Sequence, residues 1–242
     1  MKILGIIPAR YASTRFPGKP LADICGKTMI QHVYERAKMS EGLCGVIVAT
    51  DDERIYDCVR NFGGHAVMTD SDLPNGTARC EQAARIYGGD FGAVVNIQGD
   101  EPLLDPVMID EVCELLRDDE CATLCREMND DEMNSPNAVK VVMSQEGYAL
   151  YFSRSLIPYK RNNIPLPIYQ HIGIYGYHMG FLKKYVALPE TPLSMAESLE
   201  QLKILEHGHK IRIKVTSSRH ESIGVDTPGD LEKVRGIMNE EI

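Results

Sequence analysis

Two arginines and a lysine are concentrated in the opening of a chain that is otherwise acidic. Arg10, Arg15 and Lys19 lie in the segment "PARYASTRFPGKPL" (8–21), and no acidic residue precedes Asp23, although the 242-residue chain carries a net charge of −9. A guanidinium binds two phosphate oxygens at once and an ammonium adds a point charge, so these residues suit a polyanion such as a triphosphate. A solvated basic loop would account for the same charges, and charge alone does not decide between the two.

A pair of adjacent carboxylates forms a second candidate group. Asp100 and Glu101 follow the apolar run "AVVNIQ" (93–98). Carboxylate oxygens on a loop are the ligands that Mg²⁺ prefers. A Gly-Asp-Glu-Pro sequence is also common in plain turns, so the residues by themselves leave both interpretations open.

Predicted strands and helices would bring these two groups together. Apolar runs typical of buried strands occur at 3–9, 45–50, 65–69 and 93–98, and segments with helical spacing lie between them. This alternation predicts a doubly wound, Rossmann-like α/β fold with a mostly parallel sheet and helices on both faces. Such sheets bind ligands beyond the carboxyl ends of their strands, so we expect the basic loop and the carboxylates at one edge.

The pattern changes after residue 125. The segment 138–152 predicts an antiparallel hairpin that turns at 144–147, and 157–167 reads as a Pro-spaced loop. Beyond it we expect a strand at 169–177, helices at 181–187 and 195–207, a strand at 211–215 and a closing helix from Pro228.

No linker separates the two parts of the chain. The sequence therefore predicts one domain, 1–242, in which 1–125 binds the nucleotide and 137–177 is an antiparallel insertion.

Composition excludes several classes of protein. A hydrophobic content of 43% and a charged content of 25% are typical of a soluble globular protein, and no segment predicts a signal peptide or a membrane span. The acidic balance argues against nucleic-acid binding. Seven cysteines without a Cys-x-x-Cys pair indicate reduced thiols in the cytoplasm. The opening loop lacks Gly-x-x-x-x-Gly-Lys-Ser/Thr and Gly-x-Gly-x-x-Gly, which disfavours a P-loop kinase and a dinucleotide oxidoreductase.

Distinctive strings extend over nearly the whole chain. Besides "IIPARYASTRFPGKPL" (6–21) they include "VATDDERI" (48–55), "NIQGDEPL" (96–103), "HIGIYGY" (171–177), "ESLEQLKILEHG" (197–208) and "GVDTPGDLEKVR" (224–235). In order and content they closely resemble the motifs of the 3-deoxy-manno-octulosonate cytidylyltransferase (CMP-KDO synthetase) family, a group of sugar nucleotidyltransferases.

The resemblance implies a reaction and its partners. CMP would pass from CTP to the anomeric hydroxyl of 3-deoxy-manno-octulosonate (KDO), giving CMP-KDO for lipopolysaccharide biosynthesis and pyrophosphate, with Mg²⁺ as cofactor and a homodimer as the assembly. Two alternatives stay open. The substrate could be another acid sugar, amino-KDO or sialic acid, or the chain could be a noncatalytic nucleotide sensor.

The resemblance also assigns roles on the nucleotide side. It implies that Arg10, Arg15 and Lys19 hold the triphosphate and that Asp100 and Asp226 hold Mg²⁺, with Arg10, Lys19 and both aspartates catalytic. Asp226 could instead cap the closing helix, a role that Thr227 could also fill.

The cytosine and ribose would be received by Asn75, Gly76 and Arg79. Family members usually carry an acid where this chain has Ala78, which would leave Arg79 without its neighbouring charge. An ordinary surface cation is the alternative for Arg79.

For the sugar acid, the resemblance implies Gln98, His171, Tyr175, Glu200 and Gln201. His171 and Tyr175 are four apart on a predicted strand and so share a face. Glu200 falls at the margin of an apolar helix stripe, where a carboxylate needs a partner. Internally paired core residues are the alternative for His171 and Glu200.

Overall fold

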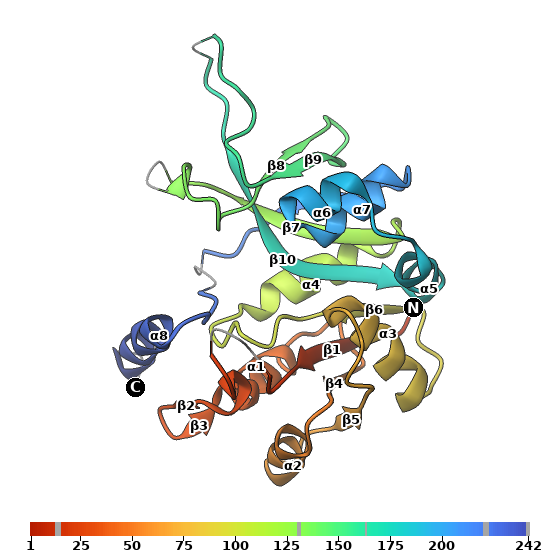
Figure 1. Cartoon of the computed structure of the whole chain (residues 1–242), viewed down its shortest axis with the longest axis vertical. Coiled ribbons are helices and arrows are strands. Elements are labelled where there is room, and N and C mark those ends of the chain that lie inside the picture. The colour runs from red at the N-terminus through yellow and green to blue at the C-terminus, as the bar shows by residue number, and fades with distance from the viewer. Residues whose placement is uncertain (13–15, 130–131, 163, 220–222, 241–242) are drawn as a thin grey trace.

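The apolar run at the start of the chain forms the central strand of the sheet, β1 (Ile3–Ala9). The structure, a computed structural model, describes residues 1–12, 16–129, 132–162, 164–219 and 223–240. In spatial order the main sheet contains β11 (Arg212–Val215), β7 (Cys121–Glu127), β10 (Tyr169–His178), β6 (Ala93–Asn96), β1, β4 (Gly45–Thr50) and β5 (Ala66–Met68) (Figure 1).

Most neighbouring strands on this path run parallel, as the sequence predicts. β1 pairs in parallel with both β4 and β6, and β7 pairs in parallel with β11. β10 runs antiparallel between β6 and β7. The sequence did not predict that this strand separates β7 from β6, because the pairing joins segments far apart in the chain.

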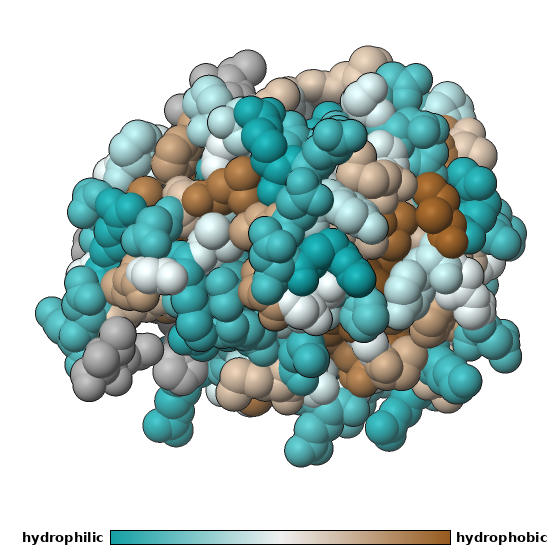
Figure 2. Space-filling model, turned by 90° about the horizontal axis from the view of Figure 1, so that it is seen from below, coloured by the Kyte–Doolittle hydropathy of each residue, from teal (hydrophilic) through white to brown (hydrophobic). Residues whose placement is uncertain are grey.

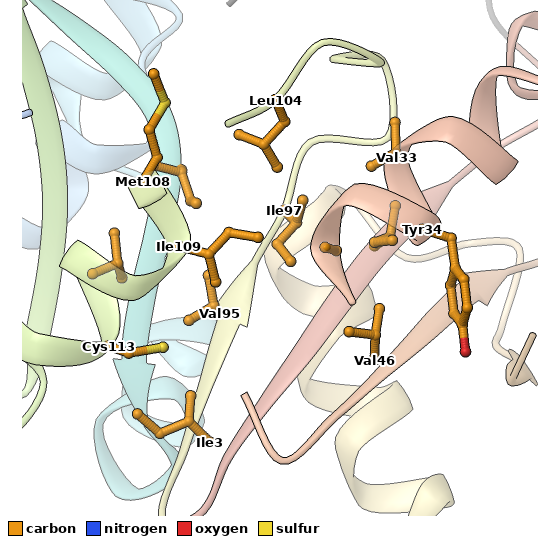
Figure 3. Packing of buried hydrophobic residues seen from close by; sticks show 14 of the residues in the cluster. Ile3, Val33, Tyr34, Val46, Val95, Ile97, Leu104, Met108, Ile109 and Cys113 are labelled. Carbon is orange, nitrogen blue, oxygen red and sulfur yellow. The ribbon is translucent and has the colours of Figure 1, made fainter. Parts of the chain in front are cut away.

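Alternate residues of the strands face two apolar cores. Ile3 and Ile7 of β1 belong to the core on one face, together with residues of α1 (Met29–Ala37), α2 (Glu53–Asn61) and α4 (Pro106–Leu115). Figure 3 shows part of this core, including Ile3. Leu4 and Ile6 pack on the other face, against α3 (Gly76–Tyr87), α5 (Met179–Ala187) and α7 (Glu200–Glu206). Each fully buried aliphatic side chain contributes about 1.5–3 kcal/mol, so these two cores hold the helices against both faces of the sheet. The doubly wound α/β fold is confirmed.

The antiparallel hairpin is also confirmed. β8 (Lys140–Met143) pairs with β9 (Ala149–Ser153) and with the start of β10. The chain between β9 and β10 extends beyond the sheet at the top of Figure 1.

The prediction of one helix over 195–207 is wrong. The structure has α6 (Pro192–Glu197) and α7, separated by Ser198, whose φ of 51° and ψ of 50° are left-handed. A residue in this conformation stops a helix, and the spacing of apolar residues did not reveal it.

A third core holds the closing helix, α8 (Pro228–Glu240), against the small β2–β3 hairpin (Asp23–Ile24 and Lys27–Thr28). Leu231 and Val234 of α8 are buried with Ile24. This packing brings the C-terminal part of the chain next to the opening loop.

The surface seen in Figure 2 is largely hydrophilic, with hydrophobic side chains in separate small groups. Within the described ranges, no helix combines the length and the apolar character that crossing a bilayer requires.

Candidate functional site

Two adjoining cavities lie at the carboxyl ends of β1 and β6. The smaller, of about 270 Å³, is bordered by Arg10, Lys19 and Arg79. The larger, of about 490 Å³, is bordered by residues of β10 and α7. Pro8, Gly76, Gln98 and Asp100 line both. The edge of the sheet therefore offers two connected compartments rather than one pocket.

The basic loop forms the cationic wall of the smaller cavity. Arg10 donates a hydrogen bond to the carbonyl of Leu73. Gly18, with a φ of 72°, turns the chain into the short 3₁₀ helix η1 (Lys19–Leu21) and donates to the carbonyl of Tyr11 over 2.9 Å. A Cβ at Gly18 would lie 3.1 Å from the Tyr11 ring, so the turn needs glycine. Arg15 lies outside the described residues.

Asp100 and Asp226 meet at Lys19. The Lys19 ammonium is 2.8 Å from Oδ2 of Asp100 and 3.4 Å from Oδ1 of Asp226. Nearby, the amide of Val225 donates to the carbonyl of Asp100 over 2.9 Å. The proximity of the two aspartates, predicted from residues more than a hundred positions apart, is confirmed.

The closing helix does not depend on Asp226 for its cap. The hydroxyl of Thr227 accepts from the amide of Asp230 over 3.3 Å, and Oδ2 of Asp230 accepts from the amide of Thr227 over 2.9 Å. This reciprocal pair caps α8. Thr227 therefore takes the structural role, and the Asp226 carboxylate is directed to Lys19.

The N-terminus of α3 forms part of the wall between the cavities. Asn75 caps it by accepting from the amide of Ala78 over 2.9 Å, and Gly76 follows as the first helical residue. A Cβ at Gly76 would come within 3.3 Å of Pro8, so glycine lets the helix approach β1 closely. The positive end of a helix dipole near two cations suits an anionic ligand.

Arg79 is fully buried, so the alternative of an ordinary surface cation is wrong. Its Nη2 lies 2.8 Å from Oδ2 of Asp51, and Nη1 donates to Thr69. The charge missing at Ala78 is therefore supplied by Asp51, at the end of β4. Sequence reasoning did not find this partner because it lies 28 positions away.

His171 and Tyr175 both line the larger cavity, as their spacing on β10 predicts. The register of β10 against β7 shifts between Ile172 and Tyr175, but the two rings stay on one face, with centroids 5.2 Å apart. His171 Nε2 is 3.0 Å from the hydroxyl of Thr123. Burial lowers the pKa of His171 to about 3, so the imidazole is neutral at physiological pH.

Two buried polar atoms of the larger cavity have no hydrogen-bond partner among the described residues. They are the hydroxyl of Tyr175 and Oδ1 of Asn96, two residues that stand opposite each other in the register of the β6–β10 pair. An unpaired buried polar atom costs free energy, which is consistent with a place for a ligand. Asn96 was missed from the sequence, although a polar residue inside the run "AVVNI" was the available signal.

Glu200 and Gln201 approach the same cavity from the start of α7. The hydroxyl of Thr77 donates to Oε2 of Glu200 over 3.4 Å, and Gln201 is buried. Glu200 is open to water through the cavity, yet burial among protein groups raises the pKa of its carboxyl above the ordinary value. Gln98 donates to the carbonyl of Gly173 over 2.9 Å and so joins β6 to β10.

The two compartments differ in chemistry. The smaller has fixed cations and a helix N-terminus, which suit phosphate groups. The larger has hydroxyl, amide, imidazole and carboxyl groups, which suit a ligand rich in hydroxyls. The carboxylates of Asp100 and Asp226 stand at the junction. This arrangement favours a group transfer between an anionic ligand and a polyol.

Comparisons with known proteins agree with this chemistry. The family model described as "Cytidylyltransferase" matches residues 4–211. A 3-deoxy-manno-octulosonate cytidylyltransferase of Geobacter sulfurreducens is 49% identical over 97% of this chain and 98% of its own. An 8-amino-3,8-dideoxy-manno-octulosonate cytidylyltransferase of Shewanella sp. (strain ANA-3) is 48% identical over 96% and 97%.

A solved structure shares the whole fold. It is the CMP:2-keto-3-deoxy-manno-octonic acid synthetase complexed with CTP, which is 44% identical, covers 100% of both chains and superposes with a TM-score of 0.94. The match of the family model over most of the chain and the identity to the relatives together show that the chain belongs to the cytidylyltransferase family.

Proposed function

We propose that this protein transfers CMP from CTP to the anomeric hydroxyl of KDO, releasing pyrophosphate. The observation that carries the proposal is the pair of cavities that meet at Asp100, one cationic and one lined by hydroxyl, amide, imidazole and carboxyl groups. Relatives at 47–49% identity are named for this reaction, and the fold matches a synthetase complexed with CTP.

The cationic cavity is the proposed place of the nucleotide. Arg10 and Lys19, together with Arg15, bind the triphosphate, while Asn75, Gly76 and Arg79 bind the nucleoside. The sugar hydroxyl attacks the α-phosphorus, and the bond to the bridging oxygen of the β-phosphate breaks. Fixed cations stabilise the negative charge that collects on the departing pyrophosphate. Positioning and charge neutralisation are sufficient for such a transfer, and no covalent enzyme intermediate is needed.

Asp100 and Asp226 fit a magnesium ion. Both offer hard carboxylate oxygens beside the cationic cavity, and Mg²⁺ commonly uses one or two carboxylates together with phosphate oxygens and water. Asp100 and Asp226 would be its protein ligands, and phosphate oxygens and water would complete its coordination. When bound, the ion would neutralise phosphate charge and polarise the attacking hydroxyl.

The larger cavity is the proposed sugar site. Gln98, His171, Tyr175, Glu200 and Gln201 would bind the hydroxyls and the carboxylate of the acid sugar. Because His171 is neutral, it acts as a hydrogen-bonding group rather than a counter-ion for that carboxylate.

A second substrate, 8-amino-KDO, is favoured by the relative of that specificity at 48% identity. The two differ by one hydroxyl or ammonium group, and the chemistry at phosphorus is the same. Pyrophosphate release with CTP, Mg²⁺ and a panel of KDO, 8-amino-KDO and sialic acid identifies the preferred acceptor. CTP binding without turnover on any acceptor would support a nucleotide sensor instead.

The aspartates have their own test. Asp226→Asn keeps the size of the side chain and removes its charge, and we expect the Mg²⁺ concentration for half-maximal turnover to rise at least about tenfold. Asp105→Asn, in the cap of α4, is the matched control, because Asp105 borders neither cavity, and its Mg²⁺ requirement should stay near that of the wild type.

We also propose a homodimer in the cytoplasm, with a product that serves lipopolysaccharide assembly. The segment that extends between β9 and β10 exposes Leu156, Tyr159, Ile164 and Leu166, which supports a protein contact there. All seven cysteines are free, which fits a reducing compartment. Sedimentation of the wild type and of Tyr159→Ser tests the dimer.

A further inference from the structure

The bend between α6 and α7 determines where two residues of the larger cavity stand. Ser198 holds the left-handed conformation that separates the helices, and residues 198–201 all border the cavity. Glu200 and Gln201 follow the bend directly. A non-glycine residue is disfavoured in this conformation, so surrounding contacts must hold it.

Arg154, at the end of β9, holds this bend. Its Nε donates to the carbonyl of Glu197 over 2.7 Å, and its Nη2 donates to the carbonyl of Ser198 over 3.3 Å. These carbonyls end α6, where the helix leaves acceptors unsatisfied. The planar fork of arginine supplies donors to both at once, which a lysine cannot do with the same geometry.

The contact is reciprocal. The Glu197 carboxylate accepts from the amide of Arg154 over 2.9 Å and from the hydroxyl of Ser153 over 2.6 Å. The side chain of each residue therefore binds the backbone of the other element. We name Ser153, Arg154 and Glu197 the Arg154 clamp.

Hydrogen bonds connect the Arg154 clamp to strand β8 of the sheet. Lys140 of β8 is fully buried and donates to the carbonyl of Arg154 over 3.0 Å and to that of Ser135 over 2.6 Å. The backbone of Lys140 also pairs with Ser153 in the hairpin. Figure 1 shows α6 and α7 beside β8 and β9. The antiparallel insertion is thus joined to the acceptor cavity through hydrogen bonds.

We propose that Arg154 is a positioning residue for the acceptor substrate. It fixes the α6–α7 bend and thereby directs Glu200 and Gln201 to the sugar, although it borders neither cavity itself. This inference rests on the proposed function, because that function makes the larger cavity the sugar site.

The test compares Arg154→Met and Arg154→Lys with Arg212→Met. Arg212 is the control, since its guanidinium likewise donates to a backbone carbonyl, that of Glu146, and also pairs with Asp119, but it borders neither cavity. In Arg154→Met we expect the KM for the acid sugar to rise about tenfold, the effect of one well-placed polar contact, with the KM for CTP within about twofold of wild type. The KM of Arg154→Lys for the acid sugar should lie between those of the wild type and Arg154→Met. Arg212→Met should change neither the KM for the acid sugar nor the KM for CTP.

Hydrogen exchange gives a second readout that needs no substrate. The backbone amides of residues 198–202 should exchange faster in Arg154→Met than in the wild type. In Arg212→Met their exchange rates should equal those of the wild type. Unchanged exchange there, or a rise of both KM values together, overturns the positioning role. If the wild type turns over no acid sugar, the proposed function fails and the acceptor role of Arg154 fails with it, and the exchange comparison then tests only whether Arg154 holds the α6–α7 bend. If Arg154→Met does not fold, Arg154→Lys carries both measurements.

Discussion

Two adjacent aspartates should respond very differently to the same substitution. Asp51 neutralises Arg79, whose side chain is 0% exposed, whereas Asp52 binds Arg54, whose side chain is 58% exposed. Changing Asp51 to Asn keeps the shape of the side chain but leaves the Arg79 charge buried without a counter-ion. The two substitutions are chemically identical, so the difference in the free energy of unfolding depends on whether the arginine partner is buried or exposed.

The magnitude follows from the burial of the pair. Removing one partner of a buried ion pair costs about 3–5 kcal/mol. We take the lower end, because Asp51 is 16% exposed and Thr69 still accepts from the guanidinium. For a chain of this size a loss of about 3 kcal/mol lowers Tm by about 10 °C, which thermal and urea unfolding both measure.

Asp52→Asn is the control for Asp51→Asn. Asp52 also caps α2 by accepting from the amide of Arg54, and asparagine caps helices equally well, so Tm should stay close to that of the wild type. In Asp51→Asn combined with Arg79→Met no buried charge remains, and part of the lost stability should return. Equal losses in Asp51→Asn and Asp52→Asn would refute the reasoning.

Three further predictions concern the cavities and the basic loop beside them. The pKa of His171 falls from 6.5 to about 3 on folding, so as the pH falls the imidazole is protonated in the unfolded chain before it is protonated in the folded chain. The free energy of unfolding should therefore drop more between pH 7 and pH 4 in the wild type than in His171→Gln. Urea unfolding at several pH values measures this difference. Gly18→Ala should destabilise the chain more than Gly26→Ala, because both glycines have a positive φ but only Gly18 faces the Tyr11 ring, and calorimetry of both variants checks it. Asn96→Val should raise the KM for the acid sugar without lowering Tm, since it removes an acceptor that no described residue satisfies; a large fall in Tm would instead mean a structural role.

The sequence was sufficient for the parts of the fold that depend on local pattern. The runs at 3–9 and 45–50 became β1 and β4 with the predicted bounds, because continuous apolar residues suit strands buried on both faces. The positions of the loops after β1 and β6 follow from the topology of parallel sheets, which is why Lys19 and Asp100 could be placed at one edge.

Other features depend on contacts that only folding creates. The break at Ser198 is held by Arg154, and the charge of Arg79 is neutralised by Asp51, so neither could be found from residue spacing. The insertion of β10 between β6 and β7 likewise depends on long-range pairing. Asn96 stood in an apolar run, where one polar residue is too weak a signal to assign a role.

The wall common to both cavities limits how such a protein can change its specificity. Pro8, Gly76, Gln98 and Asp100 touch both compartments, so a substitution that reshapes one disturbs the other. Under the proposed function, variation that exchanges one acceptor for another would be confined to the part of the larger cavity around Glu200, which the nucleotide compartment does not share. An engineer who seeks a different sugar should begin at α7 and leave the partition untouched.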